Sequence, residues 1–246
     1  MQESRYSLTA ASKEIALHPW GIRISKLIEQ YYSTQSAILD FQHINRLINY
    51  VATVDRDLPT KGIDTTDRSL TAGAAAAYAV VIYARATHAS SEARNRFPVD
   101  KWLTEDLKSK HARIIRLRNF GIGHFGYGPE KEEWPFIMEE LFVSYNEYYV
   151  SDVNIAHGRA NYRSEDVNDI NRLCSFLFPK ALSYSDERKS LLISALQAES
   201  DNQKLKQIIE KYPFDFKEFS GFQVSLSENG ERVDTRFPSG TPRRSR

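Results

Sequence analysis

The sequence of 246 residues has a single cysteine, two methionines and a net charge of only +1. One cysteine cannot form a disulfide within the chain, which favours a reducing compartment. Cys174 lies in an apolar stretch, where a buried structural thiol is the ordinary role. The near-zero charge excludes a field that draws the whole protein toward nucleic acid or acidic lipid, so any such attraction has to come from a local patch.

Long apolar segments are also missing from the sequence. Residues 1–13 are polar and lack the apolar stretch of a signal peptide. The longest apolar run, residues 72–84, is too short to span a membrane and is typical of a buried helix. Hydrophobic residues make up 41% of the chain and charged residues 26%, as in soluble globular proteins with a sizeable core. We therefore expect a cytoplasmic protein that does not bind membranes.

The motifs of metal-dependent and nucleophilic catalysis are absent as well. The sequence contains no G-x-S-x-G. Residues 121–126 match G-x-G-x-x-G, but a dinucleotide site needs a strand before these glycines and a helix after them, and here a basic helical pattern precedes them. Four histidines are scattered with none of the spacings of metal sites: His43, His88, His111 and His157. The sequence therefore predicts no metal site and no cofactor.

Over most of the sequence, apolar residues recur at the spacing of amphipathic helices. The helix that contains the alanine-rich run has almost no polar side in its middle, so we expect it at the centre of a helical bundle. Capping residues and prolines mark several of the helix ends. The predicted helices cover residues 22–32, Ser36 to Asp55, Thr66 or Asp67 to about His88, Pro98 to the glycines at 121–128, 166–179 and 185–211.

One segment has the pattern of a β-hairpin rather than a helix. Residues 141–155 are rich in tyrosine and valine, and a turn at Asn146-Glu147 would pair their two halves. From residue 221 the composition changes to Gly, Ser, Glu, Arg and Pro, which is typical of a disordered tail. The predicted organisation is an N-terminal segment with a short helix, a helical domain and this tail, over residues 1–34, 35–220 and 221–246.

A basic helical pattern ends in the most informative segment of the chain, residues 118–124. Arg118 is followed by Asn119 and, after two glycines, by His124. An arginine is a permanent cation whose planar donors suit phosphate, and a histidine exchanges a proton near neutral pH. Residues 94–128 include eight Lys or Arg against three acids, which is a local basic patch. Four residues of this patch are candidates for contacts with a nucleic-acid backbone: Lys108, Lys110, Arg113 and Arg116.

A structural role for the same segment also agrees with the pattern. The last carbonyls of a helix attract cations, so Arg118 and His124 can act as partners of a helix terminus. On an ideal helix six residues rise about 9 Å and leave the two side chains roughly two-thirds of a turn apart. For joint chemistry, either the glycines turn His124 toward Arg118, or Arg118 of one subunit works with His124 of another.

The segment resembles the R-x4-6-H motif of the HEPN superfamily, in which an arginine and a following polar residue precede a histidine. Arg118, Asn119 and His124 stand at those three positions, and the likeness extends over about residues 35–180. It implies a four-helix bundle. Together with the residue pattern it gives the predicted fold, which is mainly α: a HEPN-like helical bundle with a small β-hairpin insertion and extra C-terminal helices. It also implies a metal-independent endoribonuclease with a toxin or antiviral-defence role, acting as a homodimer in which two motifs form one site. A nucleotidyltransferase-type antitoxin or another regulatory partner fits that role.

The chemistry of these residues agrees with cleavage of RNA, which carries its own nucleophile in the 2′-OH. His124 can take the 2′-OH proton or protonate the leaving 5′-oxygen, Arg118 can stabilise charge on the phosphoryl oxygens, and Asn119 can orient either one. The products would be a 2′,3′-cyclic phosphate and a 5′-OH. Two alternatives remain: a non-catalytic HEPN-like dimeric module that binds RNA or nucleotide, and a helical regulatory or scaffold protein.

Overall fold

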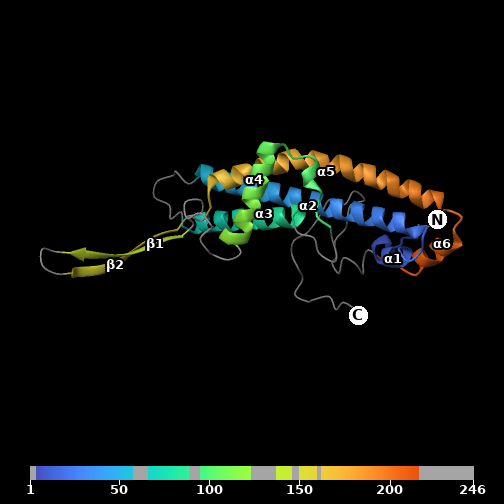
Figure 1. The fold of residues 1–246 in the computed structure, drawn as a ribbon, viewed down its shortest axis with the longest axis horizontal. Helices are drawn as coiled ribbons and strands as arrows, with labels where there is room; N and C mark the ends of the chain where they lie inside the picture. Colours follow the sequence, from blue (N-terminus) through green and yellow to red (C-terminus); the bar gives the residue numbers. More distant parts are fainter. Residues whose placement is uncertain are drawn as a thin grey trace. The chain divides into compact units, whose positions relative to one another are not determined.

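The computed structural model describes residues 4–57, 66–88, 95–122, 137–145, 150–159 and 162–215. This part of the chain is mainly helical and contains a two-stranded sheet (Figure 1). The prediction of a mainly α protein with a small β-hairpin is therefore confirmed. Contacts along the chain define two compact units, one of residues 29–191 and one of residues 1–28 with 192–246.

Long helices build the unit of residues 29–191. Figure 1 shows three of them running alongside one another while a fourth crosses them. Polar contacts join the neighbours, since Arg85 pairs with Asp40, and Gln35 Nε2 donates to Ser185 Oγ at 2.6 Å. The helices are α2 (Gly21–Asp57), α3 (Thr66–Thr87) and α5 (Ser164–Ala198), with α4 (Glu105–Arg116) across them.

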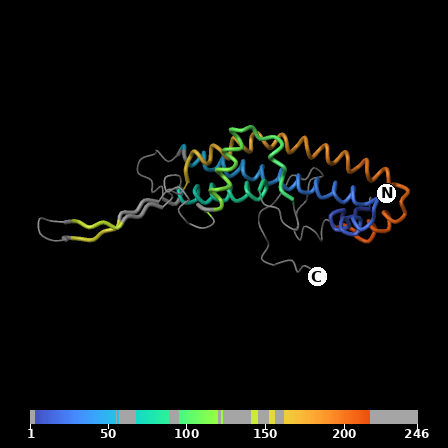
Figure 2. Tube along the Cα trace, viewed as in Figure 1, coloured from blue at the N-terminus to red at the C-terminus, as the bar shows by residue number. Residues whose placement is uncertain are grey.

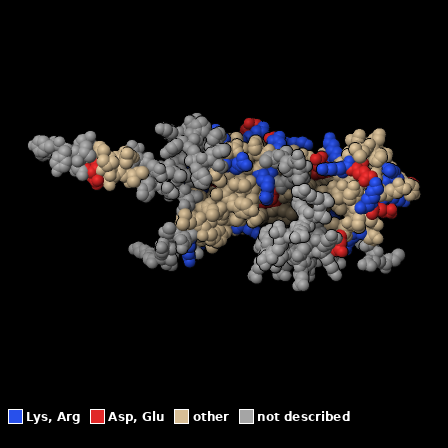
Figure 3. Space-filling model, turned by 90° about the horizontal axis from the view of Figure 1, so that it is seen from below, with Lys and Arg blue, Asp and Glu red and all other residues tan. Residues whose placement is uncertain are grey.

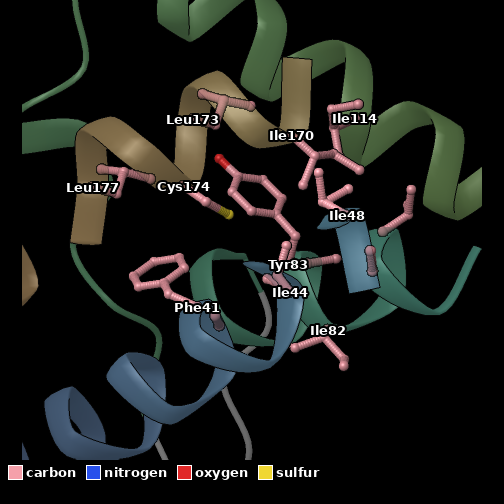
Figure 4. Packing of buried hydrophobic residues seen from close by; sticks show 14 of the residues in the cluster. Phe41, Ile44, Ile48, Ile82, Tyr83, Ile114, Ile170, Leu173, Cys174 and Leu177 are labelled. Atoms are coloured by element: carbon pink, nitrogen blue, oxygen red, sulfur yellow. The ribbon is translucent and has the colours of Figure 1, made fainter. Parts of the chain in front are cut away.

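A hydrophobic core forms where these helices meet (Figure 4). Tyr83 of α3 is fully buried at its centre, and Cys174 of α5 is fully buried close by. Burial raises the pKa of the Cys174 thiol far above its ordinary value, so the thiol stays protonated and unreactive. The remaining labelled core residues come from all four helices: Phe41, Ile44, Ile48, Ile82, Ile114, Ile170, Leu173 and Leu177.

The alanine-rich α3 is central, but it is not enclosed on every side as its composition suggests. Leu70, Tyr78 and Val81 remain exposed. By length and composition the segment Arg68–Thr87 is apolar enough to cross a membrane, with a mean hydropathy of 1.2, and 56% of it is buried inside the fold. Core helices of soluble proteins meet the same criteria, so this segment alone does not indicate a membrane protein.

Helix α2 is continuous through residues 33–36, where the sequence predicts a break and the end of an N-terminal segment. The polar residues there do not cap a new helix, because each finds a partner without interrupting the old one. Thr34 Oγ1 donates to the carbonyl of Gln30 at 2.7 Å, one turn back in the same helix. Ser33 Oγ accepts from the backbone N–H of Asn95 at 3.2 Å, so it serves a tertiary contact instead.

The helix predicted to open at Pro98 begins later than expected, at Glu105. Between these residues the chain forms a short 3₁₀ helix, η1 (Val99–Lys101), followed by extended backbone at Thr104. Phe97 accounts for the later start of the helix, because its buried ring stacks on Trp102 with 4.9 Å between the ring centroids. A continuous helix from Pro98 would not allow this turn of the backbone around the aromatic pair.

Helix α5 continues through Pro179, where the sequence predicts an end. Buried Leu177 and Ala181 lie on either side of the proline, so core packing on both sides outweighs the lost helical hydrogen bond. The helix predicted over residues 185–211 is instead divided in two. α5 ends at Ala198, and Asn202 caps a separate helix by accepting from the N–H groups of its first turn.

The predicted β-hairpin is present as β1 (Ile137–Tyr145) and β2 (Val150–Arg159), paired antiparallel. Leu141 faces Ile155 and Val143 faces Val153 across the strands. The predicted turn at residues 146–147 lies outside the described residues.

Two short helices, α1 (Leu8–Ile15) and α6 (Gln203–Glu210), characterise the unit of residues 1–28 and 192–246. Figure 2 shows them beside each other at opposite ends of the colour scale. Glu14 holds them together by accepting from the Tyr212 hydroxyl at 3.2 Å and by pairing with Lys211. The tail predicted from residue 221 lies outside the described residues.

Candidate nucleic-acid site at the end of helix α4

Arg118 and Asn119 lie on a single wide turn that continues α4, the π-helix η2 (Leu117–Ile122). The two ends of this turn, Leu117 and Ile122, are apolar residues five positions apart. Residues five apart on an α-helix point to different sides, whereas the wider turn of a π-helix brings them closer to the same side. Leu117 is buried and Ile122 packs against the core, so the turn lets both reach the interior.

The structure brings Arg118 and Asn119 together. Arg118 is exposed, and its Nη1 donates to Asn119 Oδ1 at 2.9 Å. Since a guanidinium has five donor hydrogens, most of them stay available for another acceptor. Isolated π turns of this kind are frequent at functional sites. His124 lies outside the described residues, so its position relative to Arg118 stays a prediction.

Two of the predicted nucleic-acid contacts face α5 instead of forming an open basic surface. Arg113 donates from Nη2 to Asp169 Oδ2 at 2.7 Å, and its Nη1 lies 3.1 Å from Asp166 Oδ1. Lys110 Nζ pairs with Asp106 at 3.1 Å and reaches Asp169 at 3.9 Å. Sequence reasoning missed this arrangement because the acids of α5 lie about fifty residues further along the chain.

The ionisation of this cluster is consistent with a structural role. Burial alone would lower the pKa of Arg113, but its hydrogen bond to Asp169 and the neighbouring carboxylates raise it overall. Burial raises the pKa of Asp166, although the charges of Arg163 and Arg113 act in the opposite direction. The cations here neutralise buried carboxylates and are not free to bind phosphate.

The remaining two predicted contacts are more accessible. Lys108 is exposed and forms a surface pair with Glu105 at 2.7 Å, which raises the pKa of the lysine. Arg116 is exposed, and no ion pair to it occurs within the described residues. On the face drawn in Figure 3, Lys and Arg lie in separate spots rather than in one continuous basic area. Of the predicted residues on α4 and η2, the accessible cations are therefore Arg116 and Arg118, with Lys108 further back on α4.

A second polar arrangement on α4, which sequence reasoning missed, joins His111 to the core. The hydroxyl of Tyr83 and Nδ1 of His111 are 2.8 Å apart, and the ring centroids are 5.6 Å apart. Burial raises the pKa of Tyr83 and lowers the pKa of His111, so both groups are neutral at pH 7. No signal in the sequence pointed to this contact, because it depends on how α3 packs against α4.

Within the described residues, no three His, Cys, Asp or Glu side chains gather closely enough to hold a metal ion. No family model, curated protein or solved structure matches the chain. The resemblance to the HEPN superfamily therefore rests on the sequence motif and stays a prediction.

Proposed function

We propose that the protein is a metal-independent endoribonuclease of the HEPN type, in which Arg118, Asn119 and His124 act on one RNA phosphodiester. The observation that carries this proposal is the exposed Arg118 guanidinium, oriented by Asn119 on the π turn at the end of α4. A guanidinium held in this way presents its free donors to phosphate with little further loss of freedom.

The residues supply the functions that RNA cleavage needs without a metal. The 2′-oxygen attacks phosphorus, the P–O5′ bond breaks, and a 2′,3′-cyclic phosphate and a 5′-OH result. Arg118 stabilises the charge that gathers on the phosphoryl oxygens. Asn119 Oδ1 is engaged by Arg118, so its amide N–H groups remain to orient a phosphate or ribose oxygen. His124 moves one of the two protons of the reaction.

The biological setting that accompanies this proposal is a cytoplasmic toxin or antiviral-defence enzyme. It acts as a homodimer on RNA, and a nucleotidyltransferase-type antitoxin or another regulatory partner restrains it. The exposed cations Lys108 and Arg116 extend the contact along the RNA backbone. The paired cations Lys110 and Arg113 hold α4 on α5 and place the turn that bears Arg118.

The test is cleavage of an oligoribonucleotide in excess chelator, with the 2′,3′-cyclic phosphate identified in the products. His124→Ala is expected to reduce the rate by about 10²–10⁴-fold, because a proton-transfer group is lost. Arg118→Ala is expected to reduce it by about 10²–10³-fold, because transition-state charge is no longer stabilised. Arg172→Ala is the matched control, since this arginine is exposed on α5 and belongs neither to the motif nor to the predicted contacts, so its loss should leave the rate unchanged.

Other outcomes would select the alternative functions. Binding of RNA by the wild type without any cleavage would identify a binding module. Absence of RNA affinity in the wild type, together with unfolding of His124→Ala, would identify a scaffold in which the motif only terminates a helix.

A further inference from the structure

Aromatic and cationic side chains alternate along one ridge of α5. Its four members follow one another at four-residue steps, the spacing at which side chains on a helix touch. Lys180 Nζ lies 6.0 Å from the ring centroid of Phe176, and Arg188 Cζ lies 4.6 Å from the ring centroid of Tyr184. Both distances are within the range of a cation–π interaction, so each cation is held over the ring that lies one turn before it.

The segment before α4 adds two more residues of these kinds at Tyr184. The Trp102 ring meets the Tyr184 ring edge to face, with 5.6 Å between the ring centroids, and Lys101 Nζ lies 5.9 Å from the Tyr184 centroid. Trp102 also stacks on the buried Phe97, so the core fixes its position. Together these side chains form an aromatic–cation cluster, which consists of Lys101, Trp102, Phe176, Lys180, Tyr184 and Arg188.

Solvent reaches both kinds of side chain in the aromatic–cation cluster. Lys101 and Lys180 are exposed. Trp102, Phe176 and Tyr184 pack against the core but remain partly exposed. A ligand can therefore contact charged groups and aromatic surface at the same place.

The arginine of the cluster has a positioning role. Arg188 pairs with Glu187, and its Nη1 donates to Gln30 Oε1 on α2 at 3.2 Å. Because its guanidinium is fixed by these two partners and lies against Tyr184, Arg188 holds the tyrosine ring in place.

The acids near the cluster do not cancel the charge of its lysines. Asp100, which precedes Lys101, pairs with Arg96 at 3.2 Å. Asp186 follows the tyrosine of the cluster by two residues on α5, so it points to the opposite side of the helix. Lys101 and Lys180 therefore remain as the charges that an anionic ligand meets, and they complement phosphate.

We propose that the aromatic–cation cluster binds an unpaired strand of RNA. Lys101 and Lys180 contact the phosphates, and bases pack on the exposed parts of the three aromatic rings. Unpaired bases present faces that stack on aromatic side chains, whereas a duplex keeps these faces inside its own stack. The choice of RNA as the ligand rests on the proposed function, and the cluster lies in the same compact unit as Arg118. The cluster makes the enzyme selective for single-stranded RNA.

The fluorescence of Trp102 tests this contact directly. The chain has three tryptophans, so a full-length variant with Trp20→Phe and Trp134→Phe keeps Trp102 alone. The probe is a 2′-O-methyl oligouridylate, which has no 2′-OH and therefore binds without being cleaved. Stacking of a base is expected to quench the Trp102 emission. The same strand annealed to its complement is expected to bind at least about 10-fold more weakly and to leave the emission unchanged.

Substitutions in the cluster separate the two kinds of contact. Lys101→Ala and Lys180→Ala are each expected to reduce the slope of log affinity against log salt concentration by about 0.7, because one phosphate contact is lost. Tyr184→Leu removes a ring and is expected to weaken binding about 10-fold. Thermal unfolding confirms that each variant folds, and the exposed lysines decide the outcome if Tyr184→Leu does not fold.

Lys189→Ala is the matched control for the lysine variants. Lys189 is exposed on the same helix, but it follows Lys180 by about two and a half turns and so points to the other side of α5. The affinity and the salt slope of this variant should equal those of the wild type.

The outcomes distinguish the cluster from the proposed function. Quenching of Trp102 by the unpaired strand, with reduced salt slopes in the two lysine variants, supports the cluster. If the wild type then fails to cleave RNA, the proposed function is overturned and the cluster stands. Binding without quenching, with unchanged slopes in Lys101→Ala and Lys180→Ala, overturns the cluster and leaves the proposed function standing. Equal affinity for strand and duplex also overturns the cluster, and the absence of both binding and cleavage overturns both proposals.

Discussion

At the scale of single residues, the position of Gly21 leaves no room for a Cβ atom. A Cβ atom at this position would lie 2.0 Å from the backbone carbonyl oxygen of Ile15, which is far inside contact distance. Backbone cannot swing away as a flexible side chain can, so Gly21→Ala forces the end of α1 away from the start of α2. We expect a loss of about 3 kcal/mol in the free energy of unfolding, measured by chemical denaturation.

Gln42→Ala is the matched control for this substitution, because Gln42 is exposed on the same helix. It should change the free energy of unfolding by less than about 0.5 kcal/mol. Equal stability of Gly21→Ala and Gln42→Ala would show that the α1–α2 junction adjusts without cost, contrary to this prediction.

At the same scale, contacts between residues that are neighbours in the sequence were predictable, and contacts between distant residues were not. Arg118 and Asn119 are adjacent, and the structure joins them by a hydrogen bond as their proximity suggests. The partner of Arg113 is Asp169, on a helix that sequence reasoning had no means of placing against α4. The contact of His111 with Tyr83 was unpredictable for the same reason, since it depends on how α3 packs against α4.

At the scale of the elements, the half-buried Arg113 makes the shortest ion pairs between α4 and α5. Arg113 is only 19% exposed and neutralises Asp166 and Asp169. Arg113→Leu leaves Asp169 with only Lys110 at 3.9 Å and Asp166 with Arg163, and we expect a loss of about 3 kcal/mol in the free energy of unfolding. Chemical denaturation at pH 7 provides the measurement.

Arg116 serves as the comparison on the same helix, because it is exposed and has no ion pair within the described residues. Arg116→Leu should leave stability within about 0.5 kcal/mol of the wild type and should weaken RNA binding instead. If Arg113→Leu were as stable as Arg116→Leu, the ion-pair cluster would contribute nothing to the packing of α4.

Helix existence was predictable from periodicity, whereas several helix ends were not. By local preference Ser33 and Pro179 favour the end of a helix, but at each of them a tertiary contact outweighs this preference. Ser33 accepts a hydrogen bond from the backbone of Asn95, and Pro179 lies between buried Leu177 and Ala181. The hairpin was predictable over residues 141–155 because alternation and β-branched residues are local signals, whereas the extension of its strands to residues 137 and 159 was not predicted. The π turn of η2 was not, since it depends on a core that both Leu117 and Ile122 reach.

For the whole molecule, the mainly α class follows from composition and apolar spacing. Whether one chain or two chains form the proposed active site does not follow from them. The proposed function leaves two ways to join Arg118 to His124, within one chain or between two. They differ in what happens when two inactive variants are combined. Arg118→Ala keeps an intact His124, and His124→Ala keeps an intact Arg118, so only a site shared between chains can be rebuilt from the mixture.

We expect co-refolded Arg118→Ala and His124→Ala to recover metal-free cleavage, to about a quarter of the wild-type rate. Random exchange makes about half of the dimers mixed, and each mixed dimer contains one of the two possible pairings between chains. A mixture of Arg118→Ala with a chain that carries both substitutions has no arginine to contribute and should stay inactive. Light scattering or sedimentation establishes that dimers form. Dimers without recovered activity would mean that each chain joins its own Arg118 and His124. In that case the glycines after Asn119 have to turn the histidine back toward the arginine.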